Sequence, residues 1–107
     1  MQVARLSLAI IGLALATHSA QAQEVDGSQK GRAMAQQVCA ECHAVGTEDV
    51  RSPNSRSPSF VAIVSTPGMT AAALNAILHT SHRSMPNLIL DTDQTNGIIA
   101  YILSLKR

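Results

Sequence analysis

The sequence CAECH, residues 39–43, contains both cysteines of this chain, and a histidine directly follows the second cysteine. Two thiols three positions apart can each form a thioether with one of the two vinyl groups of a haem. The residue after the second thiol is then held close to the iron, where an imidazole nitrogen is a strong axial ligand. The spacing of Cys39, Cys42 and His43 therefore predicts one covalently attached haem c, with His43 as an iron ligand.

Three other interpretations of the two cysteines fit the sequence less well. A structural zinc site needs four ligands, and without a second cysteine pair it would have to recruit His79 and His82. A thioredoxin-like dithiol is expected in a βαβ context, which this sequence lacks. A disulfide across so short a loop gives the least entropic stabilisation and leaves His43 unexplained. Haem attachment remains the best explanation of all three residues.

The first 22 residues have the pattern of a secretory signal peptide. Arg5 supplies a positive charge, residues 6–16 are largely apolar, and residues 20–22 form an A-x-A cleavage site. A retained membrane anchor is the alternative, but an apolar run of about eleven residues is well short of the roughly twenty that span a bilayer. We therefore predict cleavage before Gln23 and one mature domain, residues 23–107, exported to the periplasm.

The charge and composition of the mature chain disfavour one class of function and indicate that something other than side chains fills part of the core. The chain has eight Lys and Arg and seven Asp and Glu, so removal of Arg5 leaves seven of each and a formal charge of zero. A strongly basic nucleic-acid binder is therefore disfavoured. One Phe, one Tyr and no Trp provide little bulk for a core. Small domains of this kind usually recruit a metal, a disulfide or another filler.

The mature sequence predicts an all-α domain with two loops. Apolar spacing and capping residues predict the following elements: a helix over 30–38 capped by Ser28, a segment over 60–64 that is helix or strand, a helix over 71–79 capped by Thr70, and a last helix from Asp91 or Thr92 to Leu105. The loops cover residues 44–58 and 81–90. Gly97 within the last helix should cost about 1 kcal/mol relative to alanine, and the sequence pattern does not explain it.

A second iron ligand has five candidates: Met34, Met69, Met85, His79 and His82. Met85 is favoured because it lies in a loop far enough from His43 to reach the opposite haem face, and Pro86 stiffens the backbone beside it. A His/His pair would give the haem a lower potential than a His/Met pair, so the choice of ligand affects function.

The other candidates have ordinary structural explanations. We expect Met34 to pack in the core, which is the commonest use of methionine, and Met69 to fill a gap at a turn. His79 and His82 are expected on the surface near a helix end, where an imidazolium complements the helix dipole.

With these residues identified, the whole mature domain resembles the small class I cytochromes c of bacteria. Lys30-Gly31 is similar to the site where the first helix of that family crosses the last, and IIAYILSL, residues 98–105, is similar to that last helix. Tyr101 stands in the aromatic position that packs on the glycine. SMPNLIL, residues 84–90, is similar to the family's methionine loop. The resemblance implies a cytochrome c-like fold of about three to five helices wrapped around one covalently bound haem.

The resemblance also implies a proline whose carbonyl accepts the ring N–H of His43, which would fix the tautomer and orientation of the imidazole. Pro53 and Pro58 are both available. We favour Pro58, because Phe60 follows it at the spacing of a haem-packing apolar residue.

The sequence departs from the family pattern in two places. Ala35 stands where the family often has an aromatic residue, and Trp is absent. Contacts with the haem propionates would therefore involve Arg51, Arg56 or Tyr101, and the sequence does not choose among them.

The function implied by the resemblance is one-electron transfer by a periplasmic carrier with His43 and Met85 as ligands, not an enzyme activity. A periplasmic dehydrogenase would be the donor, and a terminal oxidase or another cytochrome the acceptor. One alternative is a tightly bound cytochrome subunit of such a dehydrogenase, which the neutral charge fits slightly better. Another is a ligand sensor or peroxidase-like protein, for which His82 is the available distal acid or base. Whether Arg83 marks a docking surface is left open.

Overall fold

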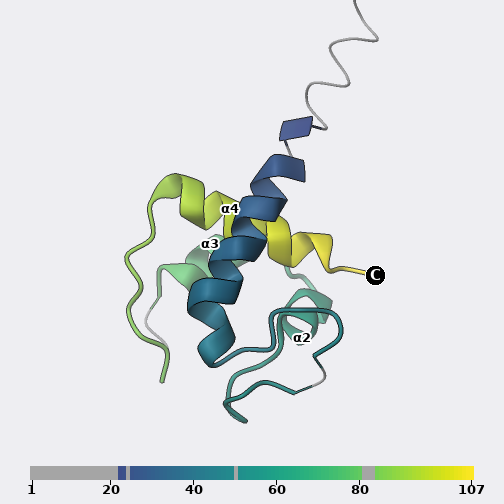
Figure 1. The fold of residues 1–107 in the computed structure, drawn as a ribbon, viewed down its shortest axis with the longest axis vertical. Helices are drawn as coiled ribbons and strands as arrows, with labels where there is room; N and C mark the ends of the chain where they lie inside the picture. The colour runs from purple at the N-terminus through teal and green to yellow at the C-terminus, as the bar shows by residue number, and fades with distance from the viewer. Residues whose placement is uncertain (1–21, 24, 50, 81–83) are drawn as a thin grey trace, which may run out of the picture.

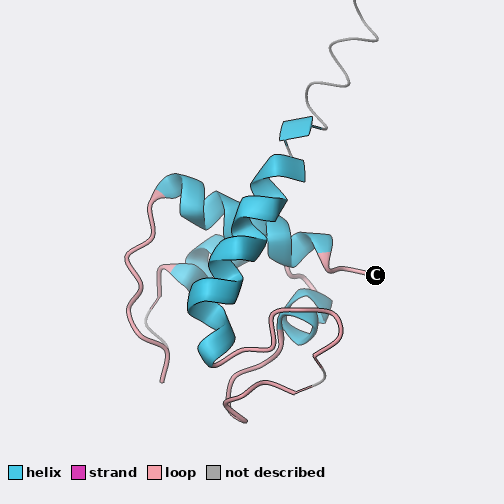
Figure 2. Ribbon diagram, viewed as in Figure 1, coloured by secondary structure: helices cyan, strands magenta, loops and turns pink. Residues whose placement is uncertain are grey.

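The computed structural model describes residues 22–23, 25–49, 51–80 and 84–107. The predicted signal peptide, apart from its last residue, lies outside the described residues, and so do His82 and Arg83. In the described part of the chain every regular element is helical and no strand occurs (Figure 2). None of these helices is long and apolar enough to cross a membrane. The prediction of an all-α fold is confirmed.

The chain runs from an N-terminal helix through a short 3-10 turn and a long loop into three further helices (Figure 1). The N-terminal helix includes residues 25–38. It is followed by the elements η1 (Cys39–Glu41), α2 (Phe60–Ser65), α3 (Ala71–Leu78) and α4 (Thr92–Ser104). Both α2 and α3 pack against α4. The last helix is therefore the element around which the others are arranged.

The N-terminal helix begins earlier than its sequence pattern predicted. Residues 25–38 are all helical, so Ser28 lies inside the helix and is not its cap. The added turn carries an ion pair between Asp26 and Lys30 at 2.7 Å. Oppositely charged side chains four residues apart stabilise a helix. This pair therefore supports the first turn of the helix, which the predicted cap at Ser28 had excluded.

The other helix boundaries follow from local side-chain caps. The ambiguous segment is helical: α2 starts after Ser59, whose side chain accepts a hydrogen bond from the backbone of Ala62. The predicted cap Thr70 accepts from Ala73 N at 3.2 Å. Asp91 and Gln94 form a reciprocal capping box at the start of α4. Each cap satisfies a backbone N–H that has no partner within the helix.

The N-terminal helix crosses α4 at two glycines, and this explains Gly97. A Cβ added at Gly31 would lie 2.8 Å from Ile98 N and even closer to the Gly97 carbonyl. A Cβ added at Gly97 would lie 3.2 Å from Gly27 O and 3.3 Å from Gly31 N. The two backbones therefore touch, which only residues without a side chain permit. The helical cost of Gly97 is offset by this contact.

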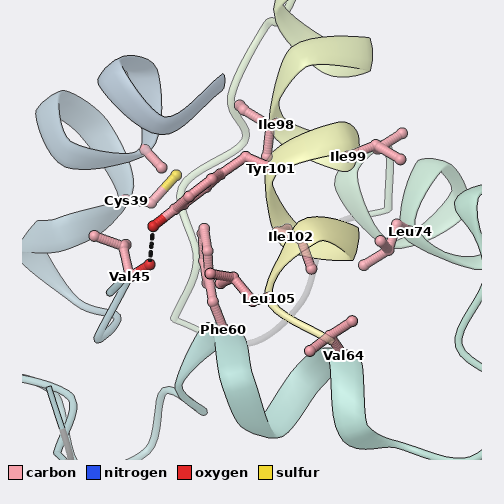
Figure 3. Packing of buried hydrophobic residues seen from close by; sticks show 11 residues of the cluster. Cys39, Val45, Phe60, Val64, Leu74, Ile98, Ile99, Tyr101, Ile102 and Leu105 are labelled. Atoms are coloured by element: carbon pink, nitrogen blue, oxygen red, sulfur yellow. Dashed lines mark hydrogen bonds between the residues drawn. The ribbon is translucent and has the colours of Figure 1, made fainter. Parts of the chain in front are cut away.

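The hydrophobic core fills the space between α4 and the rest of the domain (Figure 3). Ile98, Ile102 and Leu74 are almost completely buried there. Tyr101 donates a buried hydrogen bond from its hydroxyl to Val45 O at 2.7 Å, and its ring lies 6.3 Å from that of Phe60. The packing of Tyr101 on Gly31 stays a prediction, since the three atoms nearest to a Cβ added at Gly31 belong to Gly97 and Ile98 and do not bear on it. Through its hydroxyl, the tyrosine connects α4 to the loop after η1.

Candidate functional site

The two thiols and the imidazole lie on one tight turn at the end of the N-terminal helix. Cys42 N and His43 N both donate to Cys39 O, at 3.1 Å and 2.9 Å. Cys39 belongs to the core cluster, with 8% of its surface exposed, whereas Cys42 is only half-buried. Burial raises the pKa of the Cys39 thiol, because desolvation disfavours the thiolate. The turn thus holds one thiol against the core and the other nearer to solvent.

The His43 ring is oriented by the backbone of the following loop. Its Nδ1 lies 2.7 Å from the Pro58 carbonyl oxygen. A carbonyl only accepts, so Nδ1 carries the proton and Nε2 keeps its lone pair for a metal. The structure thus contains the hydrogen bond that the sequence analysis assigned to Pro58 in preference to Pro53. The Phe60 ring lies 5.8 Å from the imidazole, at an interplanar angle of 51°, and supports it from the core side.

The loop from residue 44 to residue 58 is tied to the cysteine turn by several hydrogen bonds. Ser52 Oγ accepts from Ala44 N at 3.0 Å, Asn54 N donates to Cys42 O at 3.2 Å, and Phe60 N donates to Ala44 O at 2.9 Å. These bonds fix the loop on which the Pro58 carbonyl is presented to His43. The sequence analysis identified the loop but not the residues that anchor it, Ser52 and Asn54. The sequence of a polar loop does not show which of its residues will form hydrogen bonds with one another.

A cavity beside this turn brings together the predicted haem ligands. Cys39, Cys42, His43 and Met85 all line it. Its other walls include the apolar side chains of Val38, Pro58, Pro86 and Leu88. The sequence analysis singled out the two prolines but not Val38 or Leu88. Haem c needs two thiols, a nitrogen ligand, a second axial ligand and apolar surroundings for the macrocycle. The chemistry of this set of side chains fits that group.

The competing ligand candidates that the structure describes lie elsewhere. Met34 and Met69 pack against the hydrophobic core, as the sequence analysis expected. His79 is exposed and its Nδ1 lies 2.8 Å from Asn75 O within its own helix. It lines a separate polar pocket beside the start of α4. Of the described candidates, Met85 is therefore the residue that shares a cavity with His43.

The three candidates for contact with the haem propionates differ in position. Arg56 lines the cavity, and its backbone N–H donates to Asn54 Oδ1 at 3.0 Å. Arg51 is exposed and is not part of the cavity wall. The Tyr101 hydroxyl already donates to Val45 O. Arg56 is the one of the three that faces this site.

The described fold and site define a class of small all-α proteins that bind a haem through a Cys-x-x-Cys-His turn. The model of the cytochrome c family matches residues 28–106, and the chain belongs to the cytochrome c family, whose members carry haem c and transfer electrons. Comparisons with curated proteins and with solved structures give no match.

Proposed function

We propose that this protein is a monohaem electron carrier of the bacterial class I type, with His43 and Met85 as the two axial ligands. The observation that carries the proposal is the shared cavity of Cys39, Cys42, His43 and Met85. The proposal includes cleavage after residue 22 and export to the periplasm, where a dehydrogenase would supply the electron and an oxidase or another cytochrome would accept it.

When bound, haem c supplies an iron that takes up and gives back one electron. The protein residues tether and orient it. Cys39 and Cys42 would tether the haem through its vinyl groups, while the Pro58 carbonyl holds the Nδ1 proton of His43 and would leave Nε2 available to the iron. A thioether ligand favours the reduced ion, so Met85 should place the potential toward the positive end of the range for haem proteins.

The core around His43 favours rapid electron transfer. The buried Phe60 ring lies 5.8 Å from the imidazole, and the buried Tyr101 ring lies 6.3 Å from that of Phe60. A packed interior resists displacement, so the proximal ligand moves little between the two oxidation states. Little structural rearrangement is then required at each transfer.

Two methionine variants of the haem-loaded protein test the ligand assignment. Met85→Leu removes the thioether from the cavity at nearly constant volume, and Met69→Leu does the same at a core-packed site. We expect Met85→Leu to lose the sulfur-to-iron charge-transfer band of the oxidised protein and to bind CO when reduced. Met69→Leu should keep the band and exclude CO. A band that survives in Met85→Leu would contradict the proposal.

A second candidate function, a permanently bound subunit of a dehydrogenase, is favoured by the charges around the site. Among the described residues of the cavity wall, Glu41 and Arg56 carry opposite formal charges. A balanced rim provides little long-range steering of a diffusing partner. Co-purification of a larger redox subunit at native expression levels would favour this function, and a monomer that exchanges electrons freely would favour the carrier.

A further inference from the structure

The loop that carries Met85 contains an uncommon backbone conformation. Ser84 has a φ of +69° and is the only non-glycine residue with a positive φ in the described part of the chain. In this left-handed region the Cβ of an L-residue crowds the following carbonyl oxygen, and only Gly, Asn and Asp adopt it routinely. Serine has no such preference, so this conformation costs free energy at Ser84.

Met85 is also constrained from its other side. Pro86 disfavours helical backbone in the residue before it and directs that residue toward extended conformations. A left-handed residue on one side and a proline on the other leave Met85 few backbone states. Ser84, Met85 and Pro86 all line the cavity that contains Cys42 and His43. This short stretch therefore forms the wall from which the thioether can reach the site.

We infer that Ser84 is a positioning residue for Met85. Its left-handed backbone turns Met85 toward the cavity and thereby determines how firmly the thioether holds its place there. The inference rests on the proposed function, because it takes Met85 as an iron ligand. A side chain that opposes positive φ at position 84 favours loop conformations in which Met85 has left the cavity. A side chain that tolerates positive φ keeps Met85 in place.

Imidazole binding to the oxidised, haem-loaded protein tests this role, because imidazole must displace Met85 to reach the iron. Ser84→Val places a β-branched residue in a conformation that such residues strongly avoid. We expect the apparent Kd for imidazole to fall by roughly 5- to 30-fold, the factor that corresponds to the cost of one left-handed residue. Ser84→Asn should bind imidazole with the wild-type Kd or a weaker one, since Asn tolerates this conformation.

Asn87→Val provides the matched control within the same loop. Asn87 is exposed and does not have a positive φ, so a β-branched residue there meets no such restriction. Its imidazole Kd should equal that of the wild type. Thermal unfolding of all three variants separates an effect on Met85 from a general loss of stability.

The outcomes distinguish this inference from the ligand assignment. An unchanged Kd in Ser84→Val, or the same fall in Ser84→Asn or Asn87→Val, overturns the role of the Ser84 backbone while leaving Met85 as the ligand. If the wild type lacks the sulfur-to-iron band and Met85→Leu binds imidazole as the wild type does, Met85 is not a ligand. The inference and the proposed function then fail together.

Discussion

The helix crossing and the cavity beside Cys39 are built in opposite ways. Where the N-terminal helix crosses α4, Gly31 and Gly97 bring two backbones into contact and the chain completes the packing by itself. At the cavity, by contrast, the wall comes largely from loop residues, and Cys42, His43 and Met85 are half-buried. The crossing fixes the position of the helix that leads into Cys39. The side chains of the cavity, in contrast, are suited to bind a group that the chain does not supply. A substitution at the crossing should therefore change stability without changing the chemistry of the cavity, whereas loss of the bound group at the cavity should affect both.

The largest expected effect comes from removing the tether at the cavity. A Cys39→Ser/Cys42→Ser variant cannot form either thioether, so mass spectrometry of the denatured protein should find no covalent haem. With only one Phe and one Tyr in the chain, the helices alone provide a weak core. We therefore expect circular dichroism to show loss of a cooperative thermal transition. A haem-free variant that melts cooperatively would show that the helix crossing is sufficient for the fold.

The next largest effect is expected at the crossing itself. Gly31→Ala would drive a Cβ into the backbone of α4, and such overpacking typically costs about 1–3 kcal/mol or more. Chemical denaturation of the haem-loaded protein should show this loss in the free energy of unfolding, with the spectrum of the haem unchanged. Gly27→Ala is the control in the same helix, because a Cβ there meets nothing within 4 Å. Its helix propensity should stabilise the protein by up to about 1 kcal/mol.

A moderate effect is expected at Tyr101, which connects α4 to the loop that follows η1. Tyr101→Phe removes the hydroxyl that donates to Val45 O and leaves that buried carbonyl without this partner. An unsatisfied buried polar group costs about 1–3 kcal/mol. Denaturant unfolding should detect the change, while imidazole binding stays at the wild-type value. An altered imidazole affinity would instead show that the crossing and the cavity are coupled through Tyr101.

The smallest effect is expected at the exposed start of the N-terminal helix. The hydrogen bond and the charge of Asp26 raise the pKa of Lys30, so any stabilisation by the pair is present below the unfolded pKa of lysine and is lost as the pH rises through the folded value. Both side chains are exposed and their attraction is screened by solvent. Asp26→Asn should leave the thermal midpoint at neutral pH unchanged. A clear drop would mean that this turn contributes to the crossing.

The sequence predicted the helices best where a local signal was sufficient. Thr70 was identified as a cap, and the start of the last helix was narrowed to Asp91 or Thr92, because capping side chains act on backbone only a few residues away. The start of the N-terminal helix was placed too late, because Ser28 has the side chain of a typical N-cap although it lies inside the helix. Gly97 could not be explained from sequence, since its reason lies 66 positions earlier, at Gly31.

The same division applies to the site. The turn from Cys39 to His43 was predicted from spacing alone. The hydrogen bond between His43 and the Pro58 carbonyl was predicted from the family resemblance, because Phe60 follows Pro58 at the expected spacing. The anchors Ser52 and Asn54 and the left-handed Ser84 were missed. Polar loop residues form such bonds only in one three-dimensional arrangement, and a serine gives no sign in the sequence of a positive φ.

The burial of Cys39 has a consequence for the order of events during biogenesis. Its thiol belongs to a cluster completed by residues of α4, including Ile98 and Tyr101, and α4 lies more than 50 positions after Cys39 in the described chain, at Thr92–Ser104. Once that helix docks, an enzyme that joins a thiol to a vinyl group has little access to Cys39. We therefore expect haem attachment to precede the docking of α4, so that this 13-residue helix covers the thioether bond at Cys39 after the bond has formed.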